Sequence, residues 1–232
     1  DDSTTTNSQF TVTVTDVDEF DVGAASDTDG DANTLAGVIS GLSLDSMVRI
    51  EGVNKRRLES LPGAATVLSR LLKRIRPSKV VFLAGGLREG LLQQRLPEHV
   101  RREDPLISQC RAFAVRTSRF GDTGDELTNW MAPLFYGESF THSRLRSAAC
   151  LISDVAWRAH PSYRALRAFE EVFHAPFVGI DHPGRAFVAL ALHARYIGTA
   201  DAPETAFART LIDSPEVGQA KLVGVCLRLG LT

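Results

Sequence analysis

Residues 79–90 of this 232-residue chain read Lys79-Val-Val-Phe-Leu-Ala-Gly-Gly-Leu-Arg-Glu-Gly90, and this stretch decides the fold. The apolar run that ends at Leu83 predicts a short buried strand, and Gly85-Gly86 predicts a tight turn into a helix that begins near Leu87. Before this stretch, apolar residues recur every three or four positions and predict an amphipathic helix that ends before Pro77: Leu58, Leu61, Ala65, Leu68, Leu72 and Ile75. Helix, strand, turn and helix together predict an α/β unit over residues 35–95.

Beyond Arg95 the sequence carries helical patterns and almost no strand signal. One predicted helical face runs from Leu145 to Ala159, with Thr141 or Ser143 as the N-cap. Asp181-His182-Pro183 predicts a capped helix with proline in its first turn, and Pro203-Glu204 and Ser214-Pro215-Glu216 predict two more starts of this kind. We therefore expect an all-helical domain over residues 96–232 and a chain that is mostly α.

The first 34 residues differ in composition from the rest, because they hold nine acidic side chains and no Lys or Arg. The alternation from Phe10 to Asp16 predicts one strand, and the Asp-rich stretches 16–19 and 27–33 offer the oxygen ligands that Ca²⁺ prefers. This stretch resembles the strand end and linker of cadherin-like repeats in bacterial surface adhesins. We interpret residues 1–34 as a mobile or foreign segment, with a calcium-binding surface or adhesion module as the alternative function.

Residues 35–232 are basic, since they hold all 26 Lys and Arg side chains against 19 of the 28 acidic ones. This excess suits a polyanionic ligand. No basic-aromatic interleaving is present, which argues against nucleic acid. The three cysteines are far apart and predict reduced core residues of a cytoplasmic protein: Cys110, Cys150 and Cys226. No apolar stretch reaches the roughly 20 residues of a membrane span.

Three ordered blocks resemble the exopolyphosphatase/guanosine pentaphosphate phosphatase family. Gly86-Leu87-Arg88-Glu89-Gly90 is similar to the signature that ends the last α/β unit of that family's second actin-like domain. The resemblance continues through residues 145–164, which include Cys150-Leu-Ile-Ser-Asp-Val-Ala-Trp157, and through residues 177–187. It covers residues 38–232 and is typical of the proteobacterial branch. The resemblance implies the end of an actin-like (ASKHA) domain followed by a helical HD-like domain.

The resemblance also implies a function. Complete members remove terminal phosphate from inorganic polyphosphate, with Mg²⁺ holding the phosphates and a carboxylate activating water. Those carboxylates lie in an earlier part of the family's sequence that no segment here matches, so we expect no catalytic residue in this chain. The chain would represent the C-terminal portion and would contribute polyphosphate binding and homodimer contacts.

Candidate phosphate-binding residues come from glycines, which allow close backbone approach, and from arginines, whose forked donors suit phosphate oxygens. They are Gly85, Gly86, Arg88, Arg56, Arg57, Arg158 and Arg185. The alternatives stay open: a plain strand-to-helix turn with an Arg88–Glu89 ion pair, and arginines that merely solvate helix faces.

The segment Leu151-Ile-Ser-Asp-Val155 resembles the position of the His-Asp dyad of metal-dependent HD phosphohydrolases. Here Ser153 stands in the histidine position and Asp154 alone remains, so we expect no metal site. Asp154, His160 and His182 are the residues that could contribute ligands if an HD-type metal hydrolase were nevertheless present.

Overall fold

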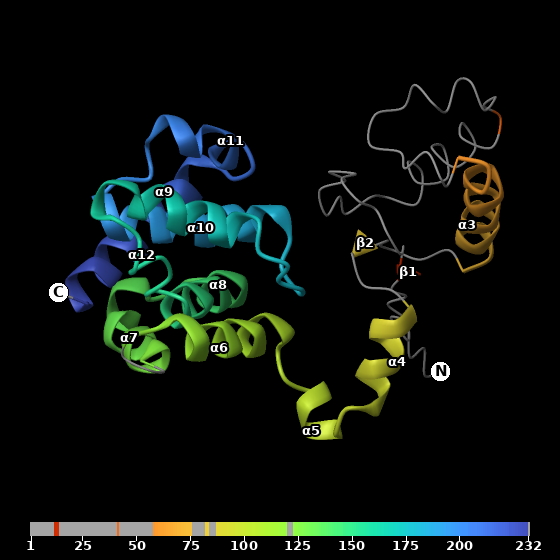
Figure 1. Cartoon of the computed structure of the whole chain (residues 1–232), viewed down its shortest axis with the longest axis horizontal. Coiled ribbons are helices and arrows are strands. Elements are labelled where there is room, and N and C mark those ends of the chain that lie inside the picture. The colour runs from red at the N-terminus through yellow and green to blue at the C-terminus, as the bar shows by residue number, and fades with distance from the viewer. Residues whose placement is uncertain are drawn as a thin grey trace, which may run out of the picture. The chain divides into compact units, whose positions relative to one another are not determined.

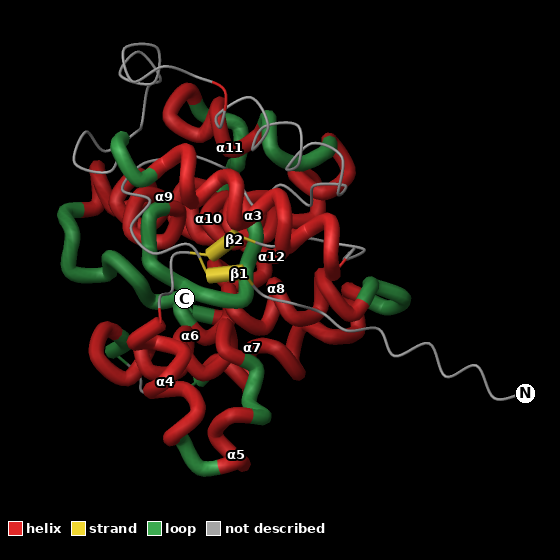
Figure 2. Tube along the Cα trace, turned by 90° about the vertical axis from the view of Figure 1, so that its right-hand side faces the viewer, coloured by secondary structure: helices red, strands yellow, loops and turns green. Residues whose placement is uncertain are grey.

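The computed structural model describes residues 58–75, 82–83, 87–119 and 123–231, together with residues 12–13 and residue 41. The chain divides into two compact units, Asp1–Arg101 and Arg102–Thr232. Helices make up most of the described chain, as Figures 1 and 2 show. The prediction of a mostly α protein is therefore confirmed.

The first unit contains the predicted helix as α3 (Leu61–Ile75), which buries Ala65 and Leu72 on one face. Lys73 and Arg74 lie in its last turn, where positive charge interacts favourably with the helix dipole. Two short strands pair in parallel, β1 (Val12–Thr13) and β2 (Phe82–Leu83), and each lies within a strand predicted from the sequence. The helices α4 (Leu87–Arg95) and α5 (Glu98–Arg101) follow.

The second unit is helical throughout its described residues (Figure 1). Its α-helices are α6 (Pro105–Thr117), α7 (Gly124–Met131), α8 (Phe140–Leu151), α9 (Arg164–Phe173), α10 (His182–Ile197), α11 (Ala206–Arg209) and α12 (Ser214–Gly230). Three 3₁₀ turns join them, η2 (Ala132–Phe135), η3 (Pro161–Tyr163) and η4 (Pro203–Thr205).

Helix α10 is the centre of the second unit, because it packs against α8, α9, α11 and α12. Its residues from Ala186 to Ala194 are all buried. Gly224 of α12 allows the closest of these contacts, since a Cβ at this position would collide with the carbonyl oxygen of Ala191. The three cysteines lie in or beside this core, buried and unpaired, as predicted.

The predicted cap of α10 is confirmed, whereas α12 is capped by Asp213, one residue before the predicted Ser214. Asp181 caps α10 by accepting a hydrogen bond from Gly184 N at 2.9 Å. Asp213 and Glu216 form a reciprocal capping box at the start of α12. The predicted cap of α8 was wrong: the helix begins at Phe140, and Ser139 caps it by accepting from His142 N. Thr141 and Ser143 therefore lie inside the helix.

The predicted helical face from Leu145 to Ala159 was also too long. Helix α8 ends at Leu151, and residues 152–159 form a series of turns. Ala156 in these turns has a φ of 60°, a left-handed conformation that a helix cannot contain. The turn segment 152–159 thus changes the direction of the chain at Ser153-Asp154, the position that resembles the His-Asp dyad.

Candidate functional site

Asp154 is the centre of a buried hydrogen-bond network that joins three segments of the second unit. Its Oδ1 accepts from Arg119 Nη2 at 2.6 Å and from Arg195 Nη2 at 3.1 Å. Its Oδ2 accepts from Arg119 Nε at 2.9 Å and from the backbone N–H of Arg119 at 2.8 Å. Only 4% of the Asp154 side chain is exposed. One carboxylate therefore holds two guanidinium groups at the end of α6 and on α10.

Charge pairing keeps Asp154 ionised despite its burial. Burial alone would raise the pKa of Asp154, but the hydrogen bonds from Arg119 outweigh it and hold the pKa below its ordinary value. Arg195 is almost as buried as its partner, and its Nη1 has no hydrogen-bond partner within the described part of the chain. Positive charge therefore exceeds negative charge in the interior of this site.

Two aromatic rings extend the network toward the surface. The guanidinium carbons of Arg119 and Arg158 lie 5.4 Å and 4.7 Å from the centre of the Trp157 ring. Those of Arg195 and Arg164 lie 4.5 Å and 5.7 Å from the centre of the Tyr196 ring. We call this set the arginine–aromatic cluster: Arg119, Asp154, Trp157, Arg158, Arg164, Arg195 and Tyr196.

Both rings are fixed by hydrogen bonds to the backbone. Trp157 Nε1 donates to the carbonyl oxygen of Thr117 at 2.8 Å, and the Tyr196 hydroxyl donates to that of Val155 at 2.5 Å. Arg164 donates to the carbonyl oxygen of Ala159 through Nε and Nη2. The turn segment is therefore tied to α6 and α10, and the aromatic faces that support the arginines hold fixed positions.

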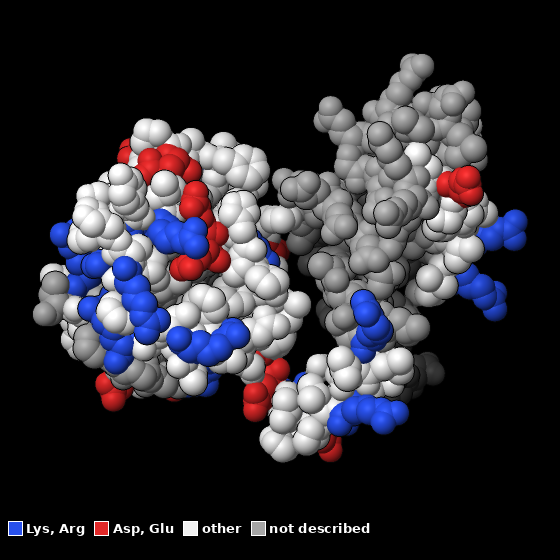
Figure 3. Space-filling model, in the orientation of Figure 1, with Lys and Arg blue, Asp and Glu red and all other residues white. Residues whose placement is uncertain are grey.

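The cluster carries four arginines and one carboxylate, so its members sum to a formal charge of +3. Arg158 is exposed and makes no ion pair with any residue that the structure describes. Figure 3 shows that Lys and Arg also gather on the left and lower part of the visible face of the second unit. Arg119 and Arg195 share the one acid, while Arg158 and Arg164 lie over the two rings, so the cluster as a whole has an excess of positive charge.

The other predicted phosphate ligands lie apart from this cluster or outside the description. Arg185 is partly buried and donates to the carbonyl oxygens of Ala175 and Phe177, which is a structural bonding pattern. Burial lowers its pKa. Arg88 is exposed near the start of α4, in the other unit. Arg56, Arg57, Gly85 and Gly86 lie outside the described residues, as do the Asp-rich stretches of residues 1–34.

The three conceivable metal ligands are not brought together. Asp154 is bound by arginines, His160 accepts a hydrogen bond from Ser162 N through Nδ1, and His182 is the first residue of α10. No group of three or more His, Cys, Asp or Glu side chains that could hold a metal occurs among the described residues. The described part of the chain therefore offers no ligand set for a metal ion.

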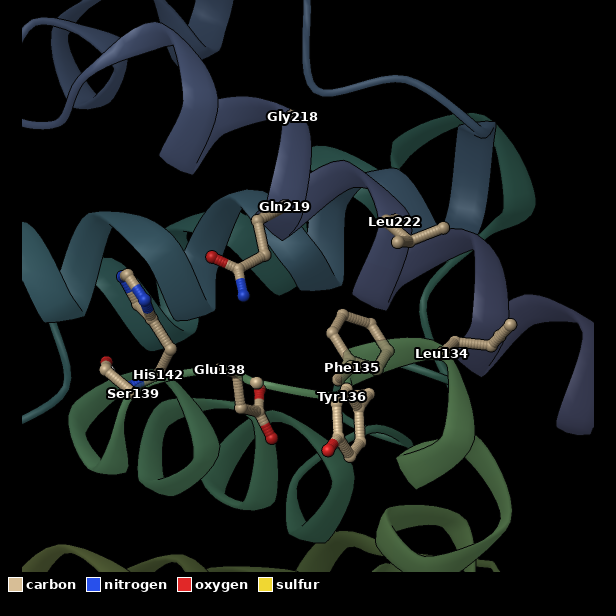
Figure 4. A pocket seen from close by; sticks show the side chains of 10 residues that line it. Leu134, Phe135, Tyr136, Glu138, Ser139, His142, Gly218, Gln219 and Leu222 are labelled. Carbon is tan, nitrogen blue, oxygen red and sulfur yellow. Dashed lines mark hydrogen bonds between the residues drawn. The ribbon is translucent and has the colours of Figure 1, made fainter.

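An open hollow of about 480 Å³ lies elsewhere on the second unit, between the segment from Leu134 to His142 and α12 (Figure 4). Gln219 points into it from α12, as Figure 4 shows. Two side chains of its lining already have partners, because Glu138 binds Arg146 and His142 binds Glu216. The hollow therefore lacks the charge excess that distinguishes the arginine–aromatic cluster.

Two members of the cluster were named from the sequence, Asp154 as a conceivable metal ligand and Arg158 as a candidate phosphate ligand, and the other five were not among the candidate site residues. Arg119 comes from a segment thirty-five positions away from Asp154, and Arg195 from one forty-one positions away. A local signal did exist in the Trp157-Arg158 and Arg195-Tyr196 pairs, since arginine often stacks on a neighbouring ring.

No helix of the described chain is both long and apolar enough to cross a membrane.

Comparison with known proteins finds a separate match for each unit. Residues 106–231 match the model of the exopolyphosphatase C-terminal domain, and residues 24–99 match that of the Ppx/GppA phosphatase family. The second match begins at residue 24, inside the acidic segment and before residue 38, where the resemblance was recognised.

A curated relative is Retrograde regulation protein 2 of Saccharomyces cerevisiae, which is 28% identical over 181 residues. The alignment covers 70% of this chain and 28% of the relative. The chain thus spans little more than a quarter of the length of the relative that it matches.

Proposed function

Because the chain belongs to the exopolyphosphatase (Ppx/GppA) family, we propose that it is the C-terminal portion of an exopolyphosphatase-type phosphohydrolase. Such an enzyme releases terminal phosphate from inorganic polyphosphate. In this proposal the second unit contributes polyphosphate binding and homodimer contacts, and catalysis depends on residues outside this chain. A cytoplasmic location, suggested by three unpaired cysteines, belongs to the same proposal.

The observation that carries the proposal is the arginine–aromatic cluster. Polyphosphate is a flexible chain with about one negative charge per unit, so its binding releases counterions much as nucleic-acid binding does. Arg158 is exposed and has no ion-pair partner among the described residues, and the network around Asp154 holds Arg119 near the same Trp157 ring. Four arginines on two fixed rings suit a ligand that presents several phosphates in succession.

The fold proposal follows from the family. We propose that residues 35–95 form the end of an actin-like domain and that residues 96–232 form an HD-like helical domain. Mg²⁺ would hold phosphates in the complete enzyme. The described residues contain no cluster that fits such an ion, so no step of this proposal passes through it.

Binding is tested by titrating the chain with inorganic polyphosphate of defined length at several salt concentrations. Arg158→Gln should weaken binding severalfold and reduce the salt dependence of the affinity by about one counterion, since one phosphate contact is lost. Arg167→Gln is the matched control, because it removes the same charge from an exposed position on α9. Equal effects of the two substitutions would contradict a localised site.

Catalysis is tested separately by measuring phosphate release from polyphosphate in the presence of Mg²⁺. We expect the chain to bind polyphosphate without releasing phosphate at an enzyme-like rate. Turnover on the order of 1 per second or faster would show that this chain contains its own catalytic centre.

A further inference from the structure

Asp154 lies at the point where polyphosphate is proposed to bind, yet it is unsuited to touch the ligand. Its side chain is 4% exposed, and its negative charge would repel phosphate. Both of its oxygens are occupied by donors from Arg119, and Oδ1 also accepts from Arg195. Its role must therefore act through the arginines that it holds.

The geometry at Arg119 shows what the carboxylate does. Nε and Nη2 of Arg119 both face Asp154, which is the two-point arrangement that fixes the plane of a guanidinium. The backbone N–H of Arg119 donates to the same carboxylate, so the main chain is fixed together with the side chain. About a third of the Arg119 side chain stays exposed. The buried edge of Arg119 is thus held in place while another part of it faces solvent.

The same carboxylate orders the other half of the cluster. Arg195 binds Oδ1 from α10 and lies over Tyr196, whose hydroxyl ties α10 to the turn segment. In the sequence, Trp157 lies between Arg119 and Arg195. Its ring is in contact with Arg119 and with Arg158. Removing the carboxylate would leave two positive charges that repel each other and would remove the two-point contact that holds Arg119 near the Trp157 ring.

We infer that Asp154 is a positioning residue for polyphosphate: it orders Arg119 and Arg195 in advance, so that the cluster binds a chain of phosphates without reordering its arginines. The inference rests on the proposed function of the second unit. In this inference the carboxylate lies at the position that resembles the His-Asp dyad, and it orders arginines by charge and hydrogen bonds in place of binding a metal. Pre-organisation of this kind raises affinity because side-chain entropy is lost before the ligand arrives.

For the polyphosphate affinity of Asp154→Asn, pre-organisation and simple electrostatics predict opposite changes. Asp154→Asn adds one net positive charge to a site for polyanions, so charge alone would tighten polyphosphate binding. Loss of ordered arginines should weaken it instead. We expect Asp154→Asn to weaken binding by about threefold to tenfold at constant salt, which is the range that ordering of one or two long side chains controls.

Glu138→Gln is the control for this experiment. Glu138 is also buried and also bound to a buried arginine, Arg146, and its replacement changes the net charge by the same amount. It belongs to a different group of contacts, so Glu138→Gln should leave the polyphosphate affinity unchanged or slightly higher. Thermal unfolding of both variants shows that each is folded at the temperature of the titration.

A second readout does not depend on the ligand. The chain has two tryptophans, Trp130 and Trp157, so a Trp130→Phe background reports on Trp157 alone. Acrylamide should quench Trp157 fluorescence more strongly in Asp154→Asn than in the parent, because Arg119 no longer covers the ring. If Asp154→Asn does not fold, Arg119→Lys takes its place: it keeps the charge and loses the two-point contact, and its affinity should fall in the same way.

The outcomes separate the inference from the proposed function. Failure of the unsubstituted chain to bind polyphosphate overturns the proposed function. Normal binding by the unsubstituted chain with equal or tighter binding by Asp154→Asn overturns the inference alone. Weaker binding with unchanged quenching of Trp157 also overturns it, because the arginines would then have stayed in place.

Discussion

Among the described residues of the second unit, Glu138 and Asp154 are nearly buried carboxylates that bind arginine, and their surroundings differ. Glu138 binds Arg146, whose Nη1 donates to the carbonyl oxygen of Thr128 and whose guanidinium lies 5.0 Å from the centre of the Phe135 ring. That site holds one acid and one base, so its charge is balanced. Asp154 binds two arginines, and the rings beside it hold two more. Balanced charge is typical of a structural pair, and an excess of positive charge is what the proposed polyphosphate site requires.

The energetic meaning of the two sites also differs. A buried ion pair adds little net stability over an apolar replacement, because desolvation offsets the attraction, although removing one partner is costly. The structural contacts of the Glu138–Arg146 pair are enough to explain why these two residues are there. The Asp154 site leaves the buried Arg195 Nη1 without a partner among the described residues, which costs stability, and it adds a second guanidinium to a single carboxylate. The following experiments test this distinction.

The largest expected effect is on folding. Asp154→Ala should destabilise the second unit by about 3–5 kcal/mol, because it leaves the buried Arg195 without its carboxylate. Glu138→Ala should cost somewhat less, since Arg146 keeps its hydrogen bond to Thr128. Urea unfolding followed by circular dichroism measures both changes. A cost below about 1 kcal/mol for Asp154→Ala would mean that water already solvates this site.

A smaller effect is expected from acid. Because the folded pKa of Asp154 lies below the ordinary value of 3.8, its contribution to stability is present above that value and is lost as the pH falls through the folded pKa. Asp104 behaves alike, since its hydrogen bond to Arg144 lowers its pKa. Urea midpoints between pH 7 and pH 2 should therefore fall on acidification. Asp154→Asn should flatten part of this fall, and an unchanged slope would contradict the assignment.

The smallest effect concerns the turn segment that brings Trp157 beside Asp154. Ala156→Gly should change stability by less than about 1 kcal/mol, because relief of the left-handed conformation is offset by a more flexible unfolded chain. Ala156→Val should cost about 1–2 kcal/mol, since a β-branched side chain tolerates this conformation poorly. Thermal unfolding of the two variants is the measurement. Equal stabilities would place Ala156 outside the left-handed region in solution.

The helices were predictable where capping residues and periodicity agreed. Asp181 followed by proline gave the start of α10, and the apolar repeat of α3 gave its buried face. The end of α8 was not predictable, because Ala156 and Ala159 favour helix and only tertiary contacts force the turns. The N-cap of α8 was misplaced for a related reason, since several residues near Ser139 can cap a helix equally well.

The candidate site was predictable only in part. Asp154 and Arg158 attracted attention through the dyad-like segment and the basic residues around it. Arg119 and Arg195 did not, because their value depends on the packing of α6 and α10 against the turn segment, and no local pattern encodes a contact across thirty-five or more positions. His160 and His182 are suitable ligands by type, but among the described residues they belong to no group of three or more possible metal ligands.

The buried cysteines have a practical consequence for chemical labelling. Burial raises the pKa of Cys110 to about 12 and that of Cys150 to about 11, and it raises the pKa of Cys226 as well. Because these thiols are buried and their pKa values are raised, we expect the chain to react only slowly with maleimides at neutral pH without any substitution. A cysteine introduced at the exposed Ser162, shortly after the turn segment, would therefore carry a dye at one defined position. The fluorescence of such a dye would report on changes near the arginine–aromatic cluster, while the core keeps its native residues.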